Sequence, residues 1–167
     1  MARGAERVTA AIVFAALVLA AASTGALFKP GAWYEELRKP DWTPPNWAFP
    51  VVWTALYAMI GYAGWLVWRT PDPALPLAFW GAQLVLNAAW SWLFFGLRRM
   101  ESALLDVALL LLCVLGFIVS AHEQAPTASL LFLPYLVWVA VAAALNLRVL
   151  QLNPLATRDA ARIARFP

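Results

Sequence analysis

Charged residues are scarce in this chain, and their scarcity excludes an ordinary soluble domain. Only 13% of the 167 residues are Asp, Glu, Lys or Arg, whereas 63% are hydrophobic. Soluble domains carry about 25% charged residues, because their surfaces must be hydrated. The long apolar runs indicate instead a protein that lies within a lipid bilayer.

Cysteine and histidine are almost absent as well. The chain has one cysteine, Cys113, and one histidine, His122. A single cysteine forms no internal disulfide, and this separated pair is not a metal-ligand set. The sequence also lacks a Ser-His-Asp arrangement, a phosphate-binding glycine loop and paired carboxylates in an apolar run. We therefore predict no metal site and no conventional catalytic site, and we leave enzymatic activity open.

Five apolar segments are each about 20 residues long, which is enough to cross a bilayer core as an α-helix. Their helical periodicity predicts an all-α membrane protein, a five-transmembrane-helix bundle in a single domain. The predicted spans are residues 8–28, 47–68, 77–97, 103–121 and 130–150, with an ordered loop at 29–46 and a polar tail at 154–167. The first run could also begin a cleavable signal peptide, but its length favours a retained helix.

The basic residues are unevenly shared between the two predicted sides of the membrane. Three lie on the N-terminal side, and nine lie on the other: Lys29, Arg38, Lys39, Arg98, Arg99, Arg148, Arg158, Arg162 and Arg165. The positive-inside rule then places the C-terminus in the cytoplasm, and we expect the membrane to be a bacterial cell membrane. This asymmetry explains the net charge of +3 and predicts no nucleic-acid partner.

Polar and aromatic side chains recur at helical spacing within three of the spans. Such groups are costly in lipid and usually face the interior of a bundle. If their faces converge, they enclose an aromatic cavity with a few amide groups, which is typical of a small-molecule site. The residues on these faces are Trp53 and Tyr57, then Gln83, Asn87, Trp90 and Phe94, then Tyr135, Trp138, Ala142 and Asn146.

Several of these residues also have a purely structural interpretation. Asn87 and Asn146 could hydrogen-bond across helices, which contributes ~1 kcal/mol in membranes. Asp106 could pair with Arg98 or Arg99 near the headgroups. Small residues at positions 74, 78 and 82 permit close helix approach, either in the monomer core or at a homodimer seam.

The densest motif lies at the start of the second span, where residues 42–57 read WTPPNWAFPVVWTALY. This run resembles the signature of the TspO/MBR family, which includes tryptophan-rich sensory proteins and the translocator protein, or peripheral benzodiazepine receptor. Further matches keep the order and spacing of that family: residues 31–34 with 39–40, 83–90 with 94–96, and 134–138 with 145–146.

The resemblance implies a five-helix membrane bundle, often a homodimer, that binds porphyrins or other apolar ligands in a pocket beneath the first loop. It implies photochemical roles for Trp53 and Trp138 in light-dependent porphyrin breakdown, with no obligatory cofactor. It places the ligand beside Trp33, Trp53, Tyr57, Asn87, Trp90, Tyr135, Trp138, Ala142 and Asn146. The expected function is a porphyrin-binding sensor or regulator, and the alternative is a transporter of porphyrins or sterols. Leu147 and Gln151 depart from the family's sterol motif, which puts sterol binding in doubt.

Overall fold

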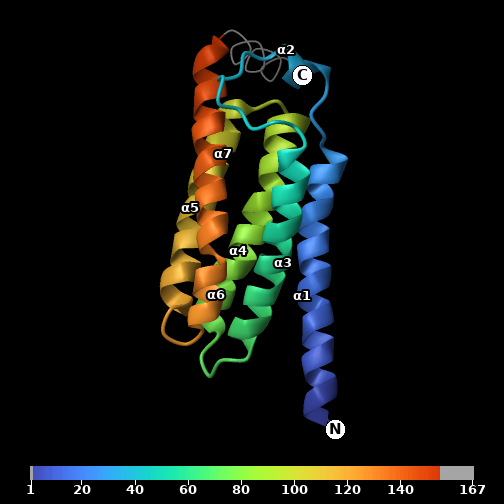
Figure 1. Ribbon diagram of the computed structural model, residues 1–167, viewed down its shortest axis with the longest axis vertical. Coiled ribbons are helices and arrows are strands. Elements are labelled where there is room, and N and C mark those ends of the chain that lie inside the picture. The colour runs from blue at the N-terminus through green and yellow to red at the C-terminus, as the bar shows by residue number, and fades with distance from the viewer. Residues whose placement is uncertain (1, 155–167) are drawn as a thin grey trace, which may run out of the picture.

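The computed structural model describes residues 2–154, and every regular element in that range is a helix. The elements are α1 (Ala2–Leu27), α2 (Ala32–Glu36), α3 (Ala48–Trp68), α4 (Ala74–Ser91), the π-helical turn η1 (Trp92–Gly96), α5 (Met100–Ala121), α6 (Pro126–Leu131) and α7 (Leu133–Leu152). The long helices run side by side along the longest axis, and α2 lies at the end opposite the N-terminus (Figure 1). The all-α prediction is confirmed, whereas the predicted tail at 154–167 lies almost wholly outside the described residues.

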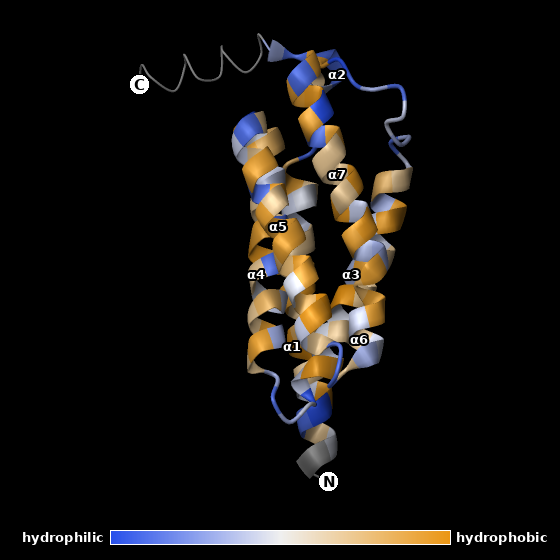
Figure 2. Ribbon diagram, turned by 90° about the vertical axis from the view of Figure 1, so that its left-hand side faces the viewer, coloured by the Kyte–Doolittle hydropathy of each residue, from blue (hydrophilic) through white to orange (hydrophobic). Residues whose placement is uncertain are grey.

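Within residues 2–154, four helical segments are long and apolar enough to cross a membrane: Gly4–Leu27, Ala48–Trp68, Met100–Ala121 and Pro126–Leu152. The segment predicted at 77–97 is also helical, as α4 and η1, but it is not among these four. Gln83 and Asn87 lower its hydropathy, although both side chains are buried. Hydrophobic residues occupy the middle of the helices and hydrophilic residues gather toward the ends (Figure 2), as expected for an integral membrane protein.

Two prolines accompany the division of the last predicted span into two helices, α6 and α7. Pro126 occupies the first turn of α6, where its missing N–H costs least. Pro134 cannot donate to the preceding turn, and the helix is interrupted at Phe132 before α7 begins. The Leu136 N–H then bonds the Phe132 carbonyl at 2.8 Å, which restarts the helix. The segment therefore begins at residue 126, four residues before the expected 130.

Glycine allows the closest helix contacts in the bundle. A Cβ atom on Gly116 in α5 would lie 2.5 Å from the Phe79 ring of α4, and one on Gly64 in α3 would lie 2.5 Å from the Trp80 ring. The Trp80 indole also donates to the Ile60 carbonyl at 2.9 Å. These contacts bring α4 against both α5 and α3, and they fix the position of the polar face on α4.

The first loop is fastened to the end of α7. Asn153 accepts a hydrogen bond from the Arg38 N–H at 3.0 Å and donates to the Arg38 carbonyl at 2.9 Å. Leu37 beside it is buried in a cluster with Phe94 and Val149. The loop is thus attached to the bundle by a pair of hydrogen bonds to the Arg38 backbone and by apolar side chains that include Leu37.

Candidate functional site

Aromatic rings from α3 and α7 meet near the end of the bundle that carries α2. Trp53 stacks on Tyr57 with ring centroids 5.1 Å apart, and its edge meets Tyr135 at 6.2 Å. Phe49 contacts Trp138 at 5.7 Å. The ribbons of α3 and α7 stand apart here (Figure 2), and these ring contacts connect the two helices. Trp53 and Trp138, both half-buried, therefore face neighbouring helices and belong to one α3–α7 aromatic cluster.

A chain of hydrogen bonds joins the polar residues beside this cluster. The Tyr57 hydroxyl donates to Asn87 Oδ1 at 2.7 Å, and Asn87 Nδ2 donates to the Tyr135 hydroxyl at 3.2 Å. The Tyr135 hydroxyl donates in turn to Gln83 Oε1 at 2.9 Å. Because each group uses its donor toward the next one, the chain has a single direction, from Tyr57 to Gln83. Three helices are joined by it.

Trp90 and Asn146 form a second polar contact, between α4 and α7. The Trp90 indole donates to Asn146 Oδ1 at 3.2 Å, and Asn146 Nδ2 donates to the Met100 carbonyl at 2.9 Å. Trp90 also stacks on Phe94 with ring centroids 5.1 Å apart. Ala142, one turn before Asn146, packs against the main core. The structural interpretation of Asn87 and Asn146 as cross-helix hydrogen-bonding residues thus agrees with their observed partners.

The first loop contributes unequally to this end of the bundle. Trp33 is half-buried, meets Phe94 at 5.9 Å and lies under the Arg98 guanidinium at 5.8 Å. Trp42, by contrast, is 53% exposed. Trp33 therefore covers the bundle, whereas Trp42 is positioned as an interfacial residue. Burial raises the pKa of the neighbouring Tyr34 phenol above its ordinary value, and Glu35 adds to that shift.

Two buried polar atoms at this site have no hydrogen-bond partner among the described residues: Gln83 Nε2 and Asp106 Oδ2. Gln83 is fully buried and lies one turn from Asn87. Its helical spacing placed it on the polar face of that span, but it is not among the ligand residues that the family resemblance implies. Asp106 is buried on α5, and its predicted ion pair with Arg98 or Arg99 is not observed among the described residues.

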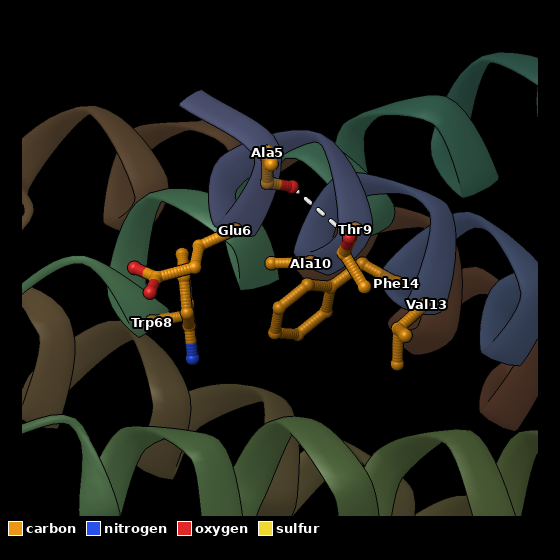
Figure 3. Close-up of a pocket in the computed structure, with 7 residues that line it drawn as sticks. All are labelled: Ala5, Glu6, Thr9, Ala10, Val13, Phe14 and Trp68. Atoms are coloured by element: carbon orange, nitrogen blue, oxygen red, sulfur yellow. Dashed lines mark hydrogen bonds between the residues drawn. The ribbon is translucent and has the colours of Figure 1, made fainter. Parts of the chain in front are cut away.

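The structure also has two adjoining hollows, and both lie at the other end of the bundle. The larger, about 490 Å³, is bounded mainly by α1, with Phe14 and Trp68 among its walls (Figure 3). The smaller, about 310 Å³, is lined by Glu6, Arg7, Trp68 and Arg69. None of the predicted ligand residues lines either hollow.

The long apolar helices define a helical integral membrane protein. Aromatic and amide side chains of α3, α4 and α7 contact one another within it. A family model described as TspO/MBR matches residues 11–152. The chain belongs to the TspO/MBR family.

Curated relatives cover most of the chain. Protein CrtK of Rhodobacter capsulatus is 43% identical over 148 residues, which are 86% of this chain and 92% of that protein. The tryptophan-rich sensory protein of Cereibacter sphaeroides is 40% identical over 142 residues, 85% and 90% of the two chains. The translocator protein of Bos taurus is 38% identical over 126 residues, 72% and 75% of the two chains.

Proposed function

We propose that this protein is a membrane sensor or regulator that binds a flat, apolar tetrapyrrole such as a porphyrin between α3 and α7. The observation that carries the proposal is the α3–α7 aromatic cluster, in which Trp53 of α3 contacts Tyr135 of α7 and Trp138 of α7 contacts Phe49 of α3. Stacked or edge contacts of this kind contribute about 0.5–1.5 kcal/mol each beyond area burial. Several such contacts suit a wide planar ligand.

The hydrogen-bond arrangement supports a ligand held mainly by its faces. Tyr57, Asn87, Tyr135, Trp90 and Asn146 already bond one another or the backbone. In the part of the chain that the structure describes, Gln83 Nε2 and Asp106 Oδ2 are the buried side-chain polar atoms without a hydrogen-bond partner. Such a site favours an apolar ring system with few polar groups over a strongly charged substrate.

The same proposal includes the membrane arrangement. With η1, α4 would form a fifth crossing, because its two buried amides are covered by neighbouring helices and do not face lipid. The small-residue face at Ala74, Ala78 and Ala82 is exposed on the outside of the bundle, which supports a homodimer seam over a role in the monomer core. The charge asymmetry supports a C-terminus in the cytoplasm.

A titration of the purified protein with protoporphyrin IX, followed by quenching of tryptophan fluorescence, tests the site. Replacing both tryptophans, Trp53→Phe with Trp138→Phe, is expected to weaken binding by about tenfold through loss of two indole contacts. The matched control is Trp92→Phe, because Trp92 is 47% exposed on the outside of η1 and should leave binding unchanged. Unchanged affinity in the double variant would contradict the site.

Light-dependent loss of the bound porphyrin is the chemical part of the proposal. The parent is expected to lose porphyrin absorbance under illumination, and the Trp53→Phe, Trp138→Phe double variant is expected to retain it. Porphyrin loss at the parental rate in a double variant that still binds would refute the photochemical role while leaving the binding role in place. The transport alternative has only the name of the mammalian relatives in its favour. Uptake of porphyrin into proteoliposomes against a gradient would support it.

A further inference from the structure

The two hollows at the N-terminal end of α1 have opposite character and share two residues. Glu6 and Trp68 line both of them. The larger hollow is otherwise bounded by Ala5, Thr9, Ala10, Val13 and Phe14 (Figure 3). The Thr9 hydroxyl donates to the Ala5 carbonyl at 3.0 Å, so this polar group is satisfied within its own helix and the wall is effectively apolar. The smaller hollow carries the charges.

Tryptophan contacts hold the charged residues of the smaller hollow in place. The Trp65 indole donates to the Arg7 carbonyl at 3.2 Å, which ties the start of α1 to the last turns of α3. The Arg69 guanidinium lies over the Trp65 ring at 4.5 Å. A cation over an indole face keeps its charge, and its remaining N–H groups can still bind an anion. Arg7, Arg69 and Glu6 all line this smaller hollow.

The apolar hollow adjoins the charged one at the end of the membrane helices. Together they match an amphiphile, whose acyl chain is apolar and whose headgroup is charged. The larger hollow is an open groove of about 490 Å³ with a largely apolar lining, as an acyl chain requires. Among its lining residues, Phe14 is buried and makes an edge contact with the Trp80 ring at 4.8 Å. This contact restricts the position of the Phe14 ring that an acyl chain would meet.

The charges indicate which headgroup fits. Two guanidinium groups attract a phosphate, and arginine binds phosphate oxygens through paired N–H donors. Glu6 would repel a headgroup that carries only negative charge, but it would bind an ammonium group. Glu6, Arg7 and Arg69 together complement a headgroup with one phosphate and one primary amine.

We propose that these two hollows form a binding site for one membrane phospholipid with an amine headgroup, such as phosphatidylethanolamine. Its phosphate lies between Arg7 and Arg69, its ammonium contacts Glu6, and one acyl chain lies against Phe14. The site is at the opposite end of the bundle from the α3–α7 aromatic cluster, so it does not depend on tetrapyrrole binding.

Native mass spectrometry of the full chain, released from detergent with equal amounts of phosphatidylethanolamine and phosphatidylglycerol, tests the site. The parent is expected to retain more of the amine lipid. Arg69→Gln should lower the retention of both lipids by about fivefold, the effect of one basic group near a lipid surface. Glu6→Gln should remove the preference and leave both lipids bound. Arg148→Gln is the matched control, because Arg148 is an exposed arginine at the far end of α7 and bonds Gln151.

A steric variant separates the hollow from nonspecific surface attraction. Ala10→Phe would place a ring in the apolar hollow without altering any charge, and it should displace the lipid as strongly as Arg69→Gln. Equal retention of both lipids by the parent, or an unaltered preference in Glu6→Gln, would overturn the headgroup assignment. Full lipid retention in Ala10→Phe, or a second copy of the chain in place of lipid, would overturn the site. An unchanged melting temperature shows that each variant remains folded.

Discussion

Removal of one hydroxyl, by Tyr135→Phe, is expected to destabilise the bundle far more than its size suggests. The Tyr135 side chain is fully buried, and its hydroxyl accepts from Asn87 and donates to Gln83. The variant would leave both amide partners without that bond inside the membrane. Each such interhelical bond contributes about 0.6–1.7 kcal/mol, so we expect a loss of about 1–3 kcal/mol.

The comparison variant is Tyr57→Phe. It removes a single hydrogen bond, from the half-buried Tyr57 hydroxyl to Asn87 Oδ1, with which the series of hydrogen bonds begins. The expected loss is therefore about 0.6–1.7 kcal/mol, roughly half that of Tyr135→Phe. Both are measured by reversible unfolding of the protein in mixed micelles of mild detergent and dodecyl sulfate, and phenylalanine preserves the ring contacts in each case.

Two results would refute this reasoning. If Tyr135→Phe costs no more than Tyr57→Phe, the buried hydroxyl does not join two partners as the observed geometry indicates. If the double variant costs the sum of the two, the bonds are independent and do not form one chain, because members of a single network deviate from additivity. A smaller combined loss is the result that the shared Asn87 predicts.

Other predictions concern packing, the loop and the site. Gly116→Ala should lower the free energy of unfolding by about 1–3 kcal/mol, because its Cβ would lie 2.5 Å from the Phe79 ring. Gly81→Ala is the control in the same unfolding assay: Gly81 has open space around it, so the variant should not be destabilised. Asn153→Ala should speed hydrogen exchange of the Arg38 amide about fivefold, since a hydrogen bond of about 1 kcal/mol is lost. Asn46→Ala, at an exposed position of the same loop, should leave that exchange rate unchanged. Ala142→Leu should reduce protoporphyrin quenching at unchanged melting temperature, and full quenching would place the ligand elsewhere.

The sequence alone determined the helical membrane class and most of the residues gathered at one end of the bundle. Apolar run length specifies a spanning helix, because backbone polar groups in lipid must be satisfied within the segment. Helical spacing then put Trp53 with Tyr57, and Asn87 with Trp90, on common faces. The sequence predicted one helix across Phe132, where the structure has a break. Pro134 did not reveal this break, because proline is also tolerated in the first turn of an uninterrupted helix.

Only the tertiary structure decided which polar groups meet. The hydrogen bonds of Asn87 join residues 30 and 48 positions away, and the clasp between Asn153 and Arg38 spans 115 positions. No local pattern encodes such pairings, since they depend on how three helices are rotated and how closely glycine lets them approach. The same rotations bury Asp106 away from the arginines, leave Gln83 Nε2 without a partner among the described residues, and create the charged hollow beside Trp68.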